Sequence, residues 1–270
     1  MSQVDPPPQP YRHPGQVFLS RYGALQTDAD VARYVAFLRQ EADINDQPPI
    51  DLSAIYQHFG MPLPLQAPLV DQQGILVDSD SGLILIKADD PRVRQRFTEG
   101  HELMELLFDA QTRCSEIGHP ALNWEESHKE RLCDQGAAEL LMPQSSFVPQ
   151  LDQLGVSLET GGTLASLYQV SLLATLVRMI EHSGGAQALI MWHGALSRKD
   201  MQRFRNCGVK AKKKLRVWWR SRTQAWTCGF IPKNKSVSGN SLIARVYATG
   251  KPETGVEMID LGGGPVHCRI

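Results

Sequence analysis

No stretch of this sequence is long and apolar enough to cross a membrane. A spanning helix needs about 20 consecutive, mostly apolar residues, and every apolar run here is interrupted before that length. The first residues, MSQVDPPPQPYRHPG, also lack the basic and then apolar layout of a secretory signal. We therefore expect a globular protein of the cytoplasm with no membrane partner.

Cysteine is scarce and scattered. The number of cysteines is odd, and no two of them form a C-x-x-C pair. This pattern indicates neither a disulfide framework nor a zinc site built from cysteines, so reduced thiols are expected. The five residues are Cys114, Cys133, Cys207, Cys228 and Cys268.

Charge is nearly balanced overall but strongly segregated along the chain. The net charge is −1, yet residues 1–195 hold 25 acidic side chains against 12 basic ones, and residues 196–235 hold 13 basic side chains against one acidic one. Tryptophans interleaved with cations in KAKKKLRVWWRSRTQAW are typical of contacts with nucleic acid or an acidic partner. Solvated surface that pairs with the acidic first part is the simpler interpretation, and we favour it because charge runs are usually solvated. The candidate contact residues are Lys210, Lys212, Lys213, Lys214, Arg216, Arg220 and Arg222.

Composition and hydrophobic patterning divide the chain into three parts. Five of the first 14 residues are proline, so residues 1–27 are predicted to form a disordered arm. Residues 28–185 combine helical patterns with one hairpin pattern and form the first predicted domain. Residues 186–270 are predicted to form a smaller β-rich domain, because the strand-like runs ALIMWHGAL, LRVWWRSRTQAW, LIARVYATG and VEMIDL follow one another there. The predicted fold class is α+β.

Periodicity and turn signals place the elements of the first domain. Apolar residues at helical spacing predict helices near 28–43 and 51–59, and GILVDSDSGLILIKADD predicts a β-hairpin around its DSDSG turn. Longer helices follow at about 91–109 and 124–142, and the second ends at Pro143. Two further helical segments are predicted in TLASLYQVSLLATLVRMIEH.

The helix predicted at 91–109 contains RFTEGHELMELLF, in which His101, Glu102 and Glu105 lie among apolar residues. At 100° per residue, His101, Glu102 and Glu105 fall in a narrow polar stripe flanked by apolar side chains. Carboxylates held together beside apolar groups repel each other or take up protons unless a cation neutralises them. We therefore expect a divalent metal ion at this stripe.

The stripe supplies both ligands and a base. His101 and Glu105 project from the same face one turn apart, which suits two ligands of a single ion. Glu102 points aside, as suits a general base that takes a proton from water without binding the metal. The helix at 124–142 offers Glu130 as a third ligand, and its small neighbours allow close helix packing. Alternatives to Glu130 on the same helix are Glu126, His128 and Asp134.

These motifs resemble those of the ImmA/IrrE-type metallopeptidases. RFTEGHELMELLF stands where the family has an R-F-T-x-A-H-E-x-x-H helix, and ERLCDQGAAELLMP stands where it has E-x-x-A-N-x-F-A-x-x-L-L-M-P. With the flanking segments, the resemblance covers roughly residues 30–183. It implies that His101 and Glu130 are zinc ligands and that Glu102 is the catalytic base. It also implies proteolysis of a regulatory protein, commonly a helix-turn-helix transcriptional repressor, in stress responses or the control of mobile elements.

The main departure from the family pattern is Glu105, which replaces the second histidine. A carboxylate binds zinc at about the same distance as an imidazole, but two anionic ligands make a divalent site neutral instead of singly positive. A less positive centre acidifies water less, and harder ions such as Mn2+ then compete better with Zn2+. Other departures are Gly100, Cys133, Asp134 and Gly136.

The sequence therefore predicts a metal-dependent endopeptidase that hydrolyses a protein substrate with metal-activated water. His101, Glu105 and Glu130 hold Zn2+, with Mn2+ or another divalent ion as alternatives, and Glu102 transfers the protons. One alternative is a catalytically inactive regulator of the same fold whose basic segment, 196–235, binds DNA or an acidic partner, which salt-sensitive DNA binding without hydrolysis would favour. Another is a module that only docks a repressor, which co-purification without cleavage would favour.

Overall fold

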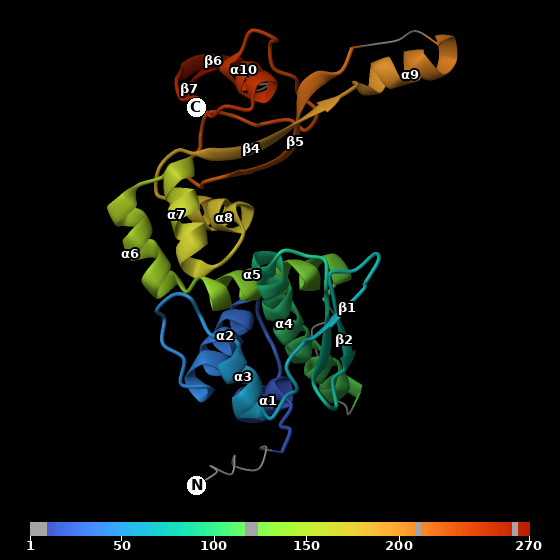
Figure 1. Cartoon of the computed structure of the whole chain (residues 1–270), viewed down its shortest axis with the longest axis vertical. Coiled ribbons are helices and arrows are strands. Elements are labelled where there is room, and N and C mark those ends of the chain that lie inside the picture. The colour runs from blue at the N-terminus through green and yellow to red at the C-terminus, as the bar shows by residue number, and fades with distance from the viewer. Residues whose placement is uncertain (1–9, 117–123, 209–211, 261–263) are drawn as a thin grey trace. The chain divides into compact units, whose positions relative to one another are not determined.

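The computed structural model describes residues 10–116, 124–208, 212–260 and 264–270. The chain divides into two compact units, Met1–Thr175 and Leu176–Ile270. The fold is α+β, as the sequence predicts, with helices dominating the first unit and two hairpins prominent in the second (Figure 1). All five cysteines are free. The domain limits predicted at residues 27 and 185 stay predictions.

The first unit combines helices with a small sheet. The strands β1 (Leu65–Ala67), β2 (Gly74–Asp78) and β3 (Leu83–Lys87) lie in the order β1-β3-β2. β2 and β3 form the predicted antiparallel hairpin, and β1 runs parallel to β3, so β2 is an edge strand. The helices are α1 (Pro14–Tyr22), α2 (Ala29–Glu41), α3 (Ser53–Phe59), α4 (Arg92–Glu116), α5 (Glu126–Leu141), α6 (Gln144–Leu154), α7 (Leu158–Tyr168) and α8 (Leu172–His182), the last of which crosses the division between the units.

Among the described residues, no single helix is long and apolar enough to cross a membrane. α7 and α8 reach that length and composition only as a pair, and a bend of 113° separates them.

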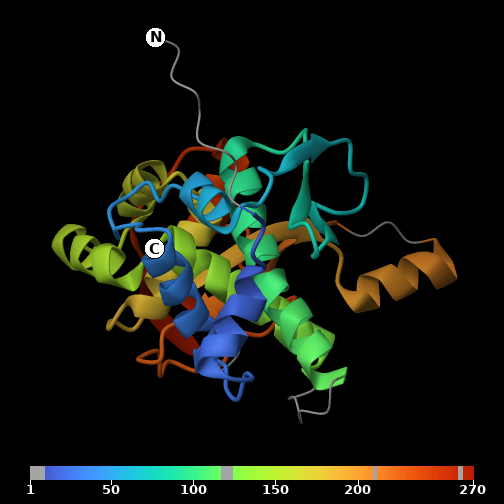
Figure 2. The same cartoon turned by 90° about the horizontal axis from the view of Figure 1, so that it is seen from below.

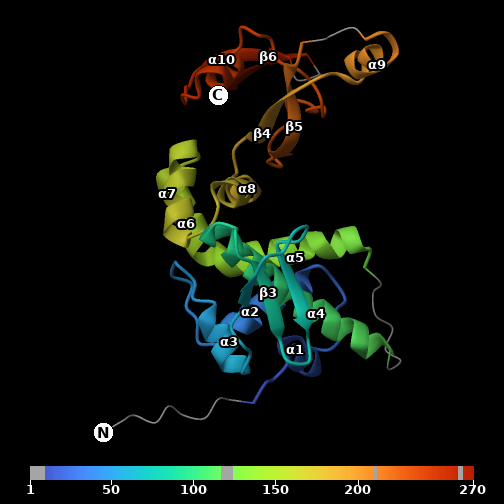
Figure 3. The same ribbon diagram turned by 45° about the vertical axis from the view of Figure 1, so that its right-hand side comes forward.

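The first unit is built around α4. This helix packs against α1, α5, β2 and β3, and Figures 1 and 3 show α5 running across it. Leu103, Met104 and Leu107 are completely buried, because their helical spacing places them on the core side of α4. The polar stripe that carries His101 and Glu105 instead lines a cavity together with residues of β2 and α5.

Two glycines allow α4 and α5 to approach closely. A Cβ atom on Gly100 would lie 3.2 Å from the Cβ atom of Ala137, and one on Gly136 would lie 2.7 Å from Cγ of Met104. A larger side chain at Gly136 would therefore push the helices apart or displace Met104. The close approach brings the polar side chains of α5 within reach of those on α4.

The sequence predicts a disordered arm over residues 1–27, but the structure forms α1 inside this segment. The side chain of His13 accepts a hydrogen bond from the backbone N–H of Gln16, and Pro14 occupies the first turn, where its missing N–H costs nothing. Phe18 and Leu19 are buried, and α1 packs against α4. The apolar anchors of Pro14–Tyr22 are therefore enough to form this helix, because they share one helix face. Residues 1–9 of the predicted arm lie outside the described residues.

The second unit holds two antiparallel hairpins. β4 (Ala188–Ala195) pairs with β5 (Lys214–Arg222), and β6 (Val256–Asp260) pairs with β7 (Pro265–Arg269). A small core forms around Val217, Ile231 and Ile259. The helix α9 (Arg198–Cys207) lies in the connection from β4 to β5, and Figure 2 shows it extending outward.

The run LIARVYATG reads as a strand in the sequence, but it forms the helix α10 (Leu242–Thr249). The side chain of Ser241 accepts a hydrogen bond from the N–H of Ala244, and Gly250 adopts a left-handed conformation at the other end. These two caps satisfy backbone groups that a strand would have to pair elsewhere. The strand prediction for this run is wrong because the caps outweigh its β-branched composition.

Candidate metal centre

Two neighbouring helices bring imidazole, carboxylate and thiol groups to one place. His101 and Glu105 lie one turn apart on α4, and Glu130, Cys133 and Asp134 lie on the side of α5 that faces them. Residues three and four apart share a helix face, so all three α5 side chains point the same way. His101 and the carboxylates line a cavity of about 660 Å³.

The imidazole of His101 is held from one side and faces two carboxylates on the other. Its Nδ1 atom lies 3.0 Å from Oδ1 of Asp134. Its Nε2 atom lies 3.5 Å from Oε2 of Glu130 and 3.9 Å from Oε1 of Glu105. Burial by itself would lower the pKa of His101, but the hydrogen bond to Asp134 and the surrounding carboxylates raise it above its ordinary value. The ring is therefore oriented with Nε2 toward a set of oxygen donors.

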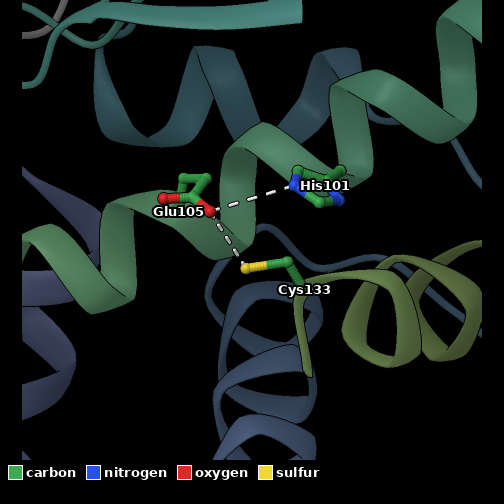
Figure 4. Close-up of side chains that lie close together, drawn as sticks. All are labelled: His101, Glu105 and Cys133. Atoms are coloured by element: carbon green, nitrogen blue, oxygen red, sulfur yellow. Dashed lines mark hydrogen bonds and ion pairs between the residues drawn. The ribbon is translucent and has the colours of Figure 1, made fainter. Parts of the chain in front are cut away.

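Glu105 uses its two oxygens in different ways. Lys129 Nζ lies 2.7 Å from Oε2, and Cys133 Sγ lies 3.4 Å from Oε1. Burial alone would lower the pKa of Lys129, but the hydrogen bond to Glu105 raises it, so the ammonium stays charged. Figure 4 shows Oε1 pointing toward both His101 and the Cys133 sulfur.

Glu102 is the most deeply buried acid of this cluster, with 7% of its surface exposed. Burial raises its pKa to about 7, with a further contribution from the negative charge of Glu105, while His101 and the backbone N–H of Leu76 lower it. β2 approaches this carboxyl group closely, since a Cβ atom on Gly74 would lie 2.7 Å from Glu102 Oε1. The strand therefore covers one side of Glu102, while the carboxyl group still lines the cavity.

The alternative donors on α5 do not share this arrangement. Glu126 lies at the cavity rim with its carboxylate 3.6 Å from Lys129 Nζ. The ring of His128 instead stacks on Trp124 at a centroid distance of 4.7 Å. Asp134 contacts Nδ1 of His101, so among the four α5 residues considered Glu130 is the one with a carboxylate 3.5 Å from Nε2. Its role as a metal ligand stays a prediction.

Sequence reasoning gives Lys129 no role and treats Cys133 only as a small residue that permits packing. The positions of these two residues relative to Glu130 could nevertheless have indicated their contacts. Lys129 directly precedes Glu130, and Cys133 follows Glu130 by three residues, which places it on the same helix face. A cysteine at such a position is a metal donor by residue type, even without a C-x-x-C pair.

The basic residues predicted as partner contacts have different environments. Lys210 lies outside the described residues, whereas Lys212, Lys213 and Lys214 are exposed. Arg220 stacks over an exposed phenylalanine ring, and Arg222 donates to a backbone carbonyl. Arg216 is buried and donates to two backbone carbonyls. The expectation of a partner contact is therefore corrected for Arg216, whose guanidinium is committed to the interior of its own unit.

Comparison with known proteins gives a match to a sequence family and matches among solved structures. A family model described as an IrrE N-terminal-like domain (Peptidase_M78) matches residues 62–179. Among solved structures, a Mycobacterium tuberculosis transcriptional regulator is similar with a TM-score of 0.53 and 11% identity, over 91% of this chain and 69% of that one. At this identity the likeness concerns the fold alone. No match was found among curated proteins. Residues 62–179, which contain the whole candidate metal centre, form an IrrE N-terminal-like domain of the ImmA/IrrE metallopeptidase family.

Proposed function

We propose that this protein is a metal-dependent endopeptidase that cleaves a regulatory protein, with a helix-turn-helix repressor as the substrate that the family resemblance favours. The observation that carries the proposal is the pairing of two groups in one cavity. The Nε2 atom of His101 faces the carboxylates of Glu105 and Glu130, and the buried Glu102 lies beside them with a pKa of about 7. Metal ligands next to a base of neutral pKa are what hydrolysis of a peptide bond requires.

The donor set fits a divalent ion. His101, Glu105 and Glu130 would hold it, and Asp134 fixes the ring of His101 through Nδ1, as outer partners of histidine ligands commonly do. Lys129 fixes the orientation of Glu105 in the same way. When bound, the metal supplies Lewis acidity that polarises the scissile carbonyl group and increases the acidity of water.

Glu102 performs the proton transfers. In its ionised form one carboxylate oxygen takes a proton from the attacking water, and the same group then gives that proton to the leaving amine. A pKa of about 7 suits both steps, because a base with this value is neither too weak to accept the proton nor too strong to release it. The N–H of Leu76 holds the carboxylate in place.

β2 is suited to hold the peptide. It is an edge strand of its sheet, and Gly74, Ile75 and Leu76 line the cavity. An extended peptide can add to such an edge through backbone hydrogen bonds. Because these bonds do not depend on side chains, sequence selection would come from elsewhere in the protein.

The test is Glu102→Gln in the zinc-loaded protein, assayed by mass spectrometry on a defined library of unstructured peptides. We expect cleavage to be lost and the zinc content to be unchanged. Glu99→Gln is the matched control, because Glu99 is also a buried acid on α4 but pairs with Arg92 outside the cavity, and this variant should cleave like wild type. Undiminished cleavage by Glu102→Gln would remove Glu102 from the mechanism.

A second candidate function is binding of duplex DNA through α9. This helix has no buried residue, and within the described part of the chain none of its cations forms an ion pair with an acid. A ten-residue helix without packing is marginal in water, so a polyanionic partner would stabilise it. The cations are Arg198, Lys199, Arg203 and Arg205.

Binding to a duplex can be measured against salt concentration. Neutralisation of phosphates predicts an affinity that decreases linearly with salt on a double-logarithmic scale. The double substitution Arg203→Glu and Arg205→Glu should weaken binding and flatten the slope. Lys251→Glu, which changes an exposed cation of the same unit outside α9, should weaken binding less. Affinity that is unaffected by the α9 changes would exclude this function.

A further inference from the structure

Cys133 is buried beside the predicted metal ligands. Its side chain has no exposed surface, and its sulfur lies 3.4 Å from Oε1 of Glu105. One donor atom each from His101, Glu105 and Cys133 lie within 4.8 Å of one another, and Figure 4 shows the three side chains converging from α4 and α5. The family pattern has an alanine where this chain has Cys133, so family resemblance assigns the thiol no role.

The spacing of these atoms is close to that of a tetrahedral zinc site. Zinc bonds of about 2.0 Å to nitrogen or oxygen and about 2.3 Å to sulfur place neighbouring donors about 3.3 to 3.6 Å apart. The distance from Glu105 Oε1 to the sulfur is 3.4 Å, and the distances from His101 Nε2 to Glu130 and Glu105 are 3.5 and 3.9 Å. Among the described residues, the donors that all lie within 4.8 Å of one another come from His101, Glu105 and Cys133, so Glu130 has to turn further toward them to bind the same ion.

Partners outside the group already hold the donors in orientation. Asp134 occupies Nδ1 of His101, which leaves Nε2 toward the centre. Lys129 occupies Oε2 of Glu105, which leaves Oε1 toward the centre. Such outer partners are usual for metal ligands, and here they direct two donors toward the sulfur of Cys133.

We propose that Cys133 is a metal ligand that adds a thiolate to the site formed by His101, Glu105 and Glu130. The inference rests on the metal centre of the proposed function. On binding, the thiol proton leaves to solvent, and the sulfur keeps its electron pair and donates it to the ion. A soft thiolate favours Zn2+ over Mn2+, which reverses the preference that the carboxylate at position 105 suggests by itself.

A fourth protein donor also changes the openness of the site. Three protein ligands leave a tetrahedral position for water, whereas four close it. Glu130 is the ligand that can leave, since its side chain is 53% exposed while that of Cys133 is buried. With all four donors bound the site would be closed, and departure of Glu130 would open it toward the cavity.

The alternative role for Cys133 is packing, with its thiol donating a weak hydrogen bond to Glu105. Absorption spectroscopy of the Co2+-loaded protein separates the two roles, because only a bound thiolate gives an intense sulfur-to-cobalt charge-transfer band in the near ultraviolet. We expect this band in the wild-type protein. Cys133→Ser should bind Co2+ without the band, and Cys207→Ser, which changes an exposed cysteine, should keep it.

Zinc affinity gives a second measurement, by competition with a chromogenic chelator. Cys133→Ser should lose at least about 10-fold in Zn2+ affinity, the lower end of what even outer partners contribute, and should lose less for Mn2+. Co2+ binding to the wild-type protein without the band would overturn the ligand role and leave the metal centre standing. Absence of Co2+ binding would overturn the metal centre and the proposed peptidase together.

Discussion

The buried carboxyl group of Glu102 makes the stability of the metal-free protein depend on pH, and Glu102→Gln should remove that dependence. Glutamine keeps the shape of the protonated acid and an oxygen that accepts from the N–H of Leu76. It cannot ionise. The comparison of wild type with this variant therefore isolates the free energy of ionising one buried group.

The magnitude follows from the pKa. Burial raises the pKa of Glu102 from 4.5 to about 7, so the folded state binds this proton more tightly than the unfolded state does. The resulting stabilisation is complete below pH 4.5 and is lost as the pH rises through about 7. Over this window the wild-type protein should lose about 3 kcal/mol of unfolding free energy relative to Glu102→Gln.

The assay is urea unfolding of chelator-treated protein, followed by far-ultraviolet circular dichroism at pH values on both sides of the window. The two proteins should be similar in stability at the acidic end, and the variant should be more stable at the alkaline end. Asp152→Asn, which alters an exposed acid, is the control and should show no comparable trend. If the difference in unfolding free energy between wild type and Glu102→Gln is constant across the window, ionisation of this carboxyl group does not destabilise the folded state.

Substitutions at three positions probe the same centre. Gly74→Ala would place a methyl group against the Thr98 side chain and 2.7 Å from Glu102 Oε1. Thermal unfolding should therefore show that the free energy of unfolding falls by about 1–3 kcal/mol, and unchanged stability would mean that β2 moves aside freely. Asp134→Ala removes the partner of the histidine Nδ1 and should reduce Zn2+ affinity by about 10-fold to 100-fold, whereas Asp134→Asn, which keeps an acceptor oxygen, should lose less; equal losses would contradict an orienting role. Elemental analysis of protein purified without chelator should find stoichiometric metal in wild type and in Glu105→His but not in Glu105→Ala; metal retained by the alanine variant would exclude this ligand.

The sequence predicts the central helices because their signals are local. The stripe of His101, Glu102 and Glu105 follows from 100° per residue on one helix, and the structure forms α4 over Arg92–Glu116. The hairpin of β2 and β3 likewise follows from two β-rich runs around a turn. Each of these features needs only neighbouring residues to be recognised.

Two helices of the second unit are hidden by their composition, although their end signals are present. α9 begins at a capping box formed by Ser197 and Asp200 and ends before Gly208 in a left-handed conformation, but its basic residues suggest only solvated loop. α10 is bounded in the same way by Ser241 and Gly250. In both cases the caps are visible in the sequence.

The pairing between helices is harder to obtain from sequence. The ion pair of Lys129 with Glu105 joins α5 to α4, and so does the approach of Cys133 to the same carboxylate. Both depend on the crossing of two helices, which periodicity does not fix. The glycine at position 136, which permits the close crossing, reads in the sequence only as a departure from a family pattern.

Clustered negative charge is weaker evidence for a metal ion than the orientation of the donor side chains. The chain already compensates each carboxylate in its own way: Lys129 pairs with Glu105, a raised pKa favours protonation of Glu102, and water reaches the exposed side chain of Glu130. Charge alone therefore does not require a bound cation. The ring of His101 is more informative, because Asp134 already binds Nδ1 and Nε2 faces two carboxylate oxygens, to which either its own proton or a shared ion can bridge it. The orientation of that ring, rather than the sum of the charges, is what favours a metal ion between α4 and α5.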